Sequence, residues 1–159
     1  MRDLADVIVV GSGAAGASAA FHLAARGRSV TLLERQNLPR PKPCGGGMAA
    51  SVQRWFPFDL SPVVDQVIEQ VRFTWDLQDP VTAVLPGDSP FWIVRRSKLD
   101  AYLAEQASAA GARVLTGEAV ERIERDGDHW RVVLAGGQSL ASRGPVSYTH
   151  LTLPTNSLV

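Results

Sequence analysis

The chain has 159 residues, of which 45% are hydrophobic, so it is long enough for one folded domain, or for one domain and the start of another. Sixteen Lys and Arg residues balance sixteen Asp and Glu residues, which leaves no net field to attract nucleic acid or an anionic membrane. The single cysteine, Cys44, excludes an internal disulfide framework and a zinc-finger cluster, and no metal site is predicted.

The sequence also argues against membrane insertion and secretion. No stretch approaches the roughly 18 apolar residues that a spanning helix needs. The N-terminus enters a predicted strand directly and lacks the basic and apolar regions of a signal peptide. We therefore expect a cytoplasmic protein.

The start of the chain predicts a strand–helix–strand unit. Residues 6–10 (DVIVV) predict a strand, because the residues after Asp6 are a continuous, β-branched apolar run, as a buried parallel strand requires. Residues 14–26 are rich in alanine and predict a helix, which Gly27 would end in the left-handed conformation. Residues 29–34 predict a second buried strand, so the whole is a βαβ unit.

The next part of the sequence predicts an irregular loop followed mainly by strands. The loop, at residues 37–47, contains three prolines and ends in three glycines. A helix at 97–110, capped by Ser97 and ended by Gly111, is predicted from its apolar stripe of Leu99, Tyr102, Leu103 and Ala107. The other predicted elements are a short helix at 48–56 and strands at 67–76, 81–85, 91–94, 113–115, 119–124, 130–134 and 139–141.

The C-terminal region differs from the rest because its charged residues stop at Arg143. The run at 146–155 (VSYTHLTLPT) resembles the in-frame translation of a sequencing adapter. We therefore expect residues 146–159 to be a non-native tail, and we exclude His150 from any catalytic role. The preceding residues are then expected to be the N-terminal part of a longer protein.

A glycine motif between the first strand and the first helix predicts a dinucleotide site. Gly11 permits a tight turn, Gly13 lets backbone approach a pyrophosphate, and Gly16 lets the helix lie close to the sheet. The helix N-terminus offers free N–H groups and a partial positive charge to the phosphates. The residues predicted to contact the pyrophosphate are Gly11, Ser12, Gly13, Ala14, Ala15 and Gly16.

Glu34 ends the second predicted strand, 18 residues after Gly16. A carboxylate there would accept both hydroxyl protons of an adenosine ribose, and its charge argues against a 2′-phosphate. The alternative is a plain βαβ unit with a solvated Glu34. The order of strand, glycines, helix and acid favours the dinucleotide site. A Pro-rich loop follows in place of another crossover helix, which favours FAD over a nicotinamide cofactor.

Residues 6–34 and the loop at 39–47 (PRPKPCGGG) resemble the geranylgeranyl reductase family, within a wider hydroxylase-like FAD superfamily. Residues 96–100 (RSKLD), with Ala107 and 111–114 after them, are similar to that superfamily's second signature. The resemblance covers residues 6–143. It implies an α/β fold, in which a Rossmann-like FAD-binding βαβ unit belongs to a three-layer β/β/α arrangement.

The resemblance also implies a division into domains. Residues 1–60 and 95–145 would form the N-terminal part of the FAD-binding domain. Residues 61–94 would be a β-rich insertion that begins the substrate domain. Trp75 and Trp92 belong to this insertion. They could line an apolar prenyl tunnel or pack in a core, and core packing is favoured.

The same resemblance implies further contacts with FAD. Arg96 would face the pyrophosphate or the ribityl chain, although an arginine at a helix start with its head in solvent is the alternative. Backbone at Val120 would meet the adenine. Asp100 is interpreted as a first-turn acid that stabilises its helix. The remaining implied cofactor-binding residues are Arg35, Cys44, Gly45, Gly46 and Gly47.

Cys44 is the candidate catalytic residue. Three glycines after it would let backbone lie against a flat ring, and the thiol beside them could deliver a proton in alkene reduction. A small buried thiol that packs as a hydrophobe is the equally weighted alternative.

These expectations combine into one predicted function. The resemblance implies an FAD-dependent oxidoreductase that reduces prenyl C=C bonds, with NAD(P)H or another donor supplying electrons. A polyprenyl substrate would bring the full protein to a membrane surface as a peripheral protein. Two alternatives stay open: a flavin monooxygenase or halogenase of the same superfamily, and an FAD-binding module that is catalytically inactive.

Overall fold

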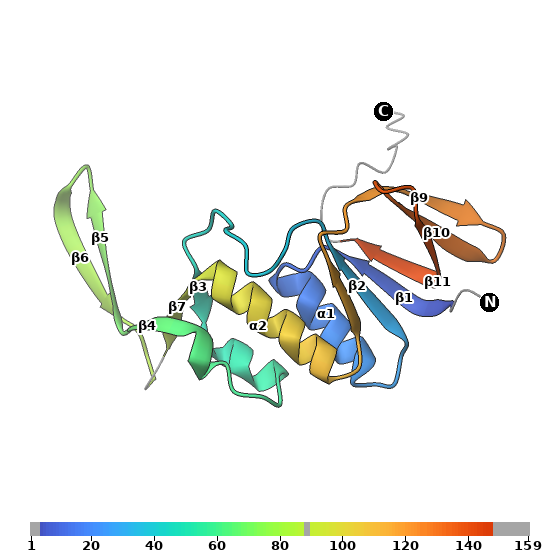
Figure 1. Cartoon of the computed structure of the whole chain (residues 1–159). Helices are drawn as coiled ribbons and strands as arrows, with labels where there is room; N and C mark the ends of the chain where they lie inside the picture. Colours follow the sequence, from blue (N-terminus) through green and yellow to red (C-terminus); the bar gives the residue numbers. More distant parts are fainter. Residues whose placement is uncertain (1–3, 88–89, 148–159) are drawn as a thin grey trace. The chain divides into compact units, whose positions relative to one another are not determined.

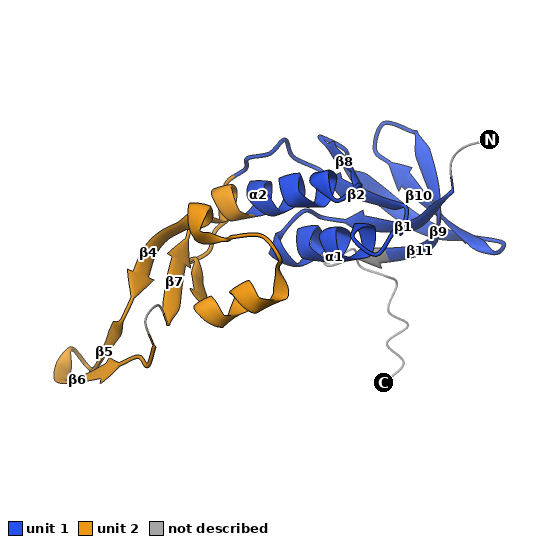
Figure 2. Cartoon of the chain, turned by 90° about the horizontal axis from the view of Figure 1, so that it is seen from below, with its two compact units in different colours: residues 1–40, 100–159 blue, residues 41–99 orange. Residues whose placement is uncertain are grey.

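The computed structural model describes residues 4–87 and 90–147 (Figure 1). The chain divides into two compact units, residues 1–40 with 100–159, and residues 41–99 (Figure 2). The first unit contains the predicted βαβ unit, and the second is an insertion in it. Among the described residues, no helix has both the length and the apolar character needed to cross a membrane.

The first unit is built on a six-stranded mixed sheet with the order β8-β2-β1-β11-β10-β9. Its first four strands are parallel neighbours, whereas β10 is antiparallel to both β11 and β9. The strands span Ala5–Val10 (β1), Val30–Glu34 (β2), Arg113–Thr116 (β8), Val120–Asp126 (β9), His129–Leu134 (β10) and Ser139–Ser147 (β11). The predicted α/β class and its parallel sheet are confirmed.

Helix α1 (Ala14–Ala24) connects β1 to β2, as the glycine motif and the alanine-rich stretch predicted. Ala17 and Ala20 are fully buried, because small side chains let the helix lie close to the sheet. The helix ends two residues before the predicted limit, and Gly27 follows with the predicted left-handed φ of 75°.

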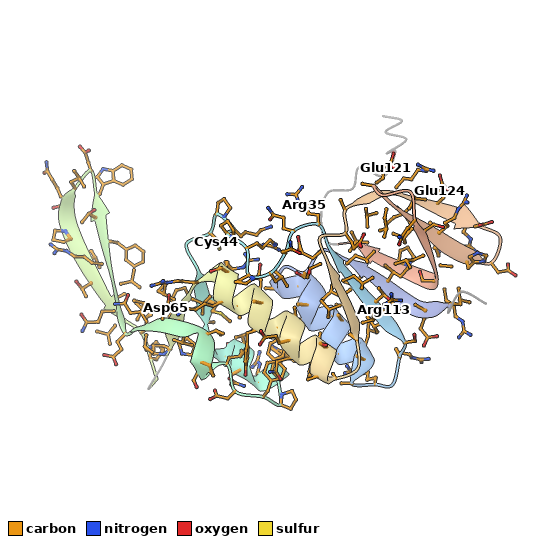
Figure 3. The ribbon with its side chains drawn as sticks, viewed as in Figure 1. Arg35, Cys44, Asp65, Arg113, Glu121 and Glu124 are labelled. Carbon is orange, nitrogen blue, oxygen red and sulfur yellow. The ribbon has the colours of Figure 1, made fainter. Side chains whose placement is uncertain are left out.

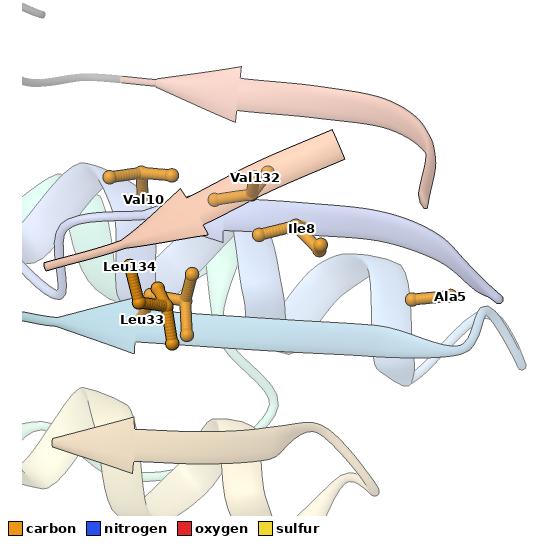
Figure 4. Close-up of a cluster of buried hydrophobic side chains, with 6 residues drawn as sticks. All are labelled: Ala5, Ile8, Val10, Leu33, Val132 and Leu134. Carbon is orange, nitrogen blue, oxygen red and sulfur yellow. The ribbon is translucent and has the colours of Figure 1, made fainter. Parts of the chain in front are cut away.

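Strand β1 is buried on both faces from Ile8 to Val10, which explains why its sequence is continuously apolar after Asp6. Val9 lies on the side of α1, since a Cβ built on Gly16 would lie 3.5 Å from the Val9 Cγ1 atom. Ile8 and Val10 lie on the opposite face, where Val132 and Leu134 of β10 cover them (Figure 4). The helix, the parallel strands and the β9–β11 meander therefore form the expected three layers.

Helix α2 (Arg96–Ala109) buries Leu99, Leu103 and Ala107, which belong to its predicted apolar stripe. It begins one residue earlier than predicted, because the Arg95 carbonyl accepts from both Lys98 N and Leu99 N. Ser97 therefore lies inside the helix and is not its cap. Gly111 ends the region with a φ of 104°, as predicted.

Strand β11 continues through Val146 and Ser147, whose backbones pair with Val9 and Val10 of β1. The predicted non-native tail thus overlaps the end of a strand by two residues. Parallel pairing uses backbone groups, so it places little demand on which side chains occupy these positions. The rest of that tail, including His150, lies outside the described residues.

The second unit contains a three-stranded antiparallel sheet and a separate hairpin. The sheet has the order β3-β7-β4, and the hairpin joins β5 to β6. The strands are Gly47–Ala49 (β3), Val64–Ile68 (β4), Gln70–Trp75 (β5), Gln78–Val84 (β6) and Phe91–Val94 (β7), with 3₁₀ helices at Ala50–Trp55 and Ser61–Val63.

Two predictions for this unit need correction. The short helix predicted at 48–56 is a 3₁₀ helix at Ala50–Trp55, whereas Met48 pairs with Trp92 in the sheet. The predicted strand at 67–76 is two strands. Trp75, favoured as a core residue, is 82% exposed near the tip of the hairpin.

Candidate functional site

The turn after β1 has the backbone geometry that the glycine motif predicted. Gly11 has a φ of 96°, and its N–H donates to the Leu33 carbonyl of β2 at 2.7 Å. Gly13 is the N-cap of α1 and has no side-chain cap hydrogen bond, and no acidic residue lies in the first helical turn. The amide-rich helix start is thus left for an outside anion, as a pyrophosphate site requires.

Gly16 lies where the helix and the turn come closest. A Cβ built on Gly16 would lie 1.9 Å from the Gly11 carbonyl oxygen, far inside van der Waals contact. Only glycine fits at this position without moving backbone. The tight turn and the adjacent helix start form the cradle that a cofactor pyrophosphate needs, so the residues present fit this group.

Glu34 faces this turn from the end of β2, as predicted. Its Oε2 atom accepts from Ser12 N at 3.0 Å and from Ser12 Oγ at 3.2 Å. Ser12 is fully buried and Glu34 is only 4% exposed, so these bonds are shielded from water. The alternative of a solvated Glu34 is therefore wrong.

An arginine that the sequence did not single out completes the site. Arg40 Nη2 donates to Glu34 Oε2 at 3.1 Å, and Arg40 Nη1 lies 3.2 Å from Asp100 Oδ2 of α2. The three side chains are 7%, 4% and 0% exposed for Arg40, Glu34 and Asp100. We call them the acid–arginine–acid cluster. Asp100 is therefore a buried ion-pair partner and not a helix-stabilising acid of the first turn.

The hydrogen bonds to Glu34 and the charge of Arg40 lower the pKa of Glu34 below its usual value. Burial by itself raises that pKa. The hydrogen bond from Arg40, backbone hydrogen bonds from Ser12 and Gln36, and the positive charge of Arg40 together lower it by more than burial raises it. Glu34 is therefore an anion in the neutral range and offers an acceptor to hydroxyl groups.

The stability of the protein should consequently fall in acid as Glu34 gains a proton. A carboxyl whose pKa is lowered by folding stabilises the native state fully above the unfolded value of about 4.5, and loses that contribution as the pH falls further. We expect the free energy of unfolding to fall more steeply below about pH 4.5 in the wild type than in Glu34→Gln, measured by urea denaturation. The exposed Glu105→Gln measures the effect of removing a surface charge, and parallel pH profiles for the wild type and Glu34→Gln would contradict the prediction.

The structure places the other predicted residues as follows. Arg35 follows β2 and its side chain is exposed (Figure 3). Val120 begins β9 and pairs with Leu134 beside the core. Arg96 begins α2 and is half-buried, while its neighbour Arg95 pairs with Asp65. The structure holds no ligand that would show whether Arg35, Arg96 or Val120 contacts a cofactor, so these roles remain predictions.

The glycine loop belongs to the second unit. Gly46 is buried with a φ of 73°, and a Cβ there would lie 2.0 Å from the Val94 carbonyl oxygen. Cys44 is exposed, and its Sγ accepts from Gly46 N at 3.4 Å. The alternative of Cys44 as a buried hydrophobe is therefore wrong.

Comparison with known proteins identifies the cofactor. Residues 6–56 match the family described as FAD dependent oxidoreductase, and this stretch contains the glycine turn, Glu34 and Arg40. Residues 6–56 therefore form the start of an FAD-dependent oxidoreductase domain. When bound, FAD supplies the redox chemistry, and Gly11–Gly16 with Glu34 are the residues that would hold its adenosine diphosphate part.

Two curated relatives extend this flavoprotein assignment beyond residue 56. Protein FixC of Escherichia coli (strain K12) is 38% identical over 137 residues, which are 79% of this chain and 32% of the relative. Digeranylgeranylglycerophospholipid reductase 2 of Methanothermobacter thermautotrophicus is 36% identical over 136 residues, 82% of this chain and 34% of the relative. The chain thus spans about a third of the length of each relative, and the predicted resemblance to geranylgeranyl reductases is confirmed.

Solved structures share the fold. A geranylgeranyl bacteriochlorophyll reductase-like protein from Thermoplasma acidophilum has a TM-score of 0.78 at 19% identity, covering 91% of this chain and 39% of its own. The halogenase PltM, in complex with phloroglucinol and FAD, has a TM-score of 0.71 at 19% identity, covering 91% and 34%. The described part of the chain therefore shares its fold with solved reductase-like and halogenase proteins.

Proposed function

We propose that the whole protein reduces C=C bonds of a prenyl lipid. The observation that supports this most is the 36% identity to a digeranylgeranylglycerophospholipid reductase across most of this chain. The matched length includes far more than the short glycine motif that many nucleotide-binding proteins share. Reduction of a C=C bond adds a hydride to one carbon and a proton to the other, so it needs a hydride donor, which reduced FAD would supply, and a proton source. The apolar substrate suits a site that excludes water.

In this proposal each part of the described chain has one task. The turn at Gly11–Gly16 and Glu34 bind the adenosine diphosphate part of FAD, with Glu34 accepting from the ribose. Gly45–Gly47 provide side-chain-free backbone for the flavin ring. Cys44 would hold the proton at its Sγ, which is exposed and accepts from Gly46 N. A nicotinamide nucleotide is the proposed electron donor, and a membrane surface is the proposed source of the lipid.

The test is anaerobic turnover. The complete protein encoded by the gene that carries residues 6–143 is loaded with FAD, reduced chemically, and mixed with a geranylgeranyl lipid in detergent. We expect mass spectrometry to find products heavier by two hydrogens for each reduced bond. Cys44→Ser should lower the turnover rate by about tenfold to a thousandfold, because a hydroxyl is a much weaker acid than a thiol. The exposed Ser51→Ala is the matched control.

The same assay decides against the other candidates. An activity that appears only with oxygen would overturn the reductase proposal and favour a monooxygenase or halogenase, a class to which the shared fold of PltM points. Bound flavin with no turnover under either condition would favour an inactive FAD-binding module.

A further inference from the structure

The two carboxylate oxygens of Glu34 are unequally occupied. Oε2 accepts three hydrogen bonds, from Ser12 N, Ser12 Oγ and Arg40 Nη2. Oε1 accepts from Gln36 N at 3.2 Å. A carboxylate has about four acceptor positions, two on each oxygen. Within the described residues, Oε1 is therefore the oxygen with acceptor capacity left.

Arg40 is what fixes this asymmetry. Its planar guanidinium contacts Glu34 through Nη2 and Asp100 through Nη1, so the two acids hold it from both sides. Asp100 belongs to α2 and is fully buried, which prevents Arg40 from moving toward solvent. A flexible lysine could approach Glu34 from several directions, whereas the planar guanidinium of Arg40 approaches it from one direction.

The cluster also has a charge that suits one class of ligand. Glu34 and Asp100 share one guanidinium, so Arg40 divides its positive charge between two buried acids and Glu34 keeps its anionic character. Such a group attracts hydroxyl donors and repels a phosphate. A ribose with free hydroxyls fits this chemistry, and a 2′-phosphorylated ribose does not.

We propose that Arg40, held by Asp100, is a positioning residue that reserves the Oε1 atom of Glu34 for a ribose hydroxyl and so sets the preference for an unmodified ribose. The inference rests on the proposed contact between Glu34 and the ribose of FAD. Arg40 acts through Glu34 and need not touch the cofactor.

The test measures ribose discrimination by the cofactor-free chain. Isothermal titration calorimetry compares ADP with 2′-deoxy-ADP and 3′-deoxy-ADP. These probes keep the phosphates, so binding at the glycine turn continues in every variant. We expect the wild type to favour ADP over the weaker deoxy analogue by about tenfold or more, the effect of one hydrogen bond to a charged group. Arg40→Met should reduce this preference to about twofold, and Asp100→Asn and Arg40→Lys should give intermediate values.

The outcomes distinguish failure of the proposed contact between Glu34 and the ribose from failure of the positioning role of Arg40. A full preference for ADP in Glu34→Gln would show that Glu34 does not contact the ribose, and the underlying proposal would fail. Loss of the preference in Glu34→Gln, with an unchanged preference in the Arg40 and Asp100 variants, would overturn the positioning role alone.

Two controls exclude a merely structural effect. Arg113→Met removes an exposed arginine from the neighbouring strand β8 and should leave the preference unchanged. A structural defect would weaken ADP and its deoxy analogues equally, and the ratio would stay as in the wild type. If circular dichroism shows that Arg40→Met does not fold, Arg40→Lys and Asp100→Asn decide by the same ratio.

Discussion

Gly16→Ala should weaken FAD binding strongly and destabilise the first unit. The new Cβ would lie 1.9 Å from the Gly11 carbonyl oxygen, so either the turn or α1 must move by more than an ångström. Overpacking of backbone against backbone costs about 3 kcal/mol or more, because neither side has a flexible side chain that can yield. We expect FAD affinity to fall at least about a hundredfold, measured by equilibrium dialysis.

Helix propensity alone predicts the opposite effect of Gly16→Ala on stability. Alanine is favoured over glycine within a helix by about 1 kcal/mol, so local propensity alone would make Gly16→Ala more stable. Gly136→Ala provides the matched control, since no atom lies within 4 Å of its built Cβ and it belongs to a turn of the same unit. A Gly16→Ala protein with unchanged FAD affinity and a raised melting temperature would disprove the close approach.

Gly46→Ala is expected to disrupt the second unit. Gly46 combines a left-handed φ of 73° with a built Cβ that would lie 2.0 Å from the Val94 carbonyl oxygen. Val94 N also donates to the Gly46 carbonyl at 2.9 Å, so a shift to relieve the clash breaks this hydrogen bond. Backbone strain and the lost hydrogen bond together should lower the free energy of unfolding by about 3 kcal/mol or more. A lower urea midpoint would measure this loss.

The adjacent glycine offers a control with the same chemistry. Gly45 has no atom within 4 Å of its built Cβ, so Gly45→Ala should change the stability by less than about 0.5 kcal/mol. Equal effects of the two substitutions would show that the loop responds to any added methyl group. That result would contradict the specific contact between Gly46 and Val94.

The first unit was largely predictable because its local signals agree. The apolar run of β1, the glycine turn, the alanine-rich helix and Glu34 each point to one βαβ unit, and the structure confirms their order. The direction of Glu34 toward the turn followed from parallel strands, whose carboxyl ends share an edge. Agreement between levels of this kind is typical of a sequence with a strongly specified fold.

The acid–arginine–acid cluster could not be predicted in the same way. Arg40 lies between Pro39 and Pro41 in a loop, where a charged residue is expected in solvent. Its burial follows only when Asp100, sixty residues later in the chain, comes beside it. The one available signal is that Asp100 falls among the buried positions of an amphipathic helix, where a carboxylate needs a partner.

The hairpin β5–β6 could not be predicted from the sequence for a different reason. Its turn at Asp76 and Leu77 has positive φ values of 47° and 60°, yet it contains none of the glycines that normally indicate such a turn. On one face, Val71, Phe73 and Trp75 alternate as in a core strand, but Phe73 and Trp75 are exposed. Alternation predicts which side chains share a face and does not say whether anything covers it.

The ion pair between Arg40 and Asp100 also affects how the inserted segment can vary in length. These residues stand at the departure and return points of the inserted segment, and both belong to the nucleotide-binding unit. A segment whose two stems are clasped can change in length at small entropic cost, since loop closure depends only weakly on length. The inserted segment can therefore differ in length while Arg40 and Asp100 keep its two ends together beside the nucleotide site.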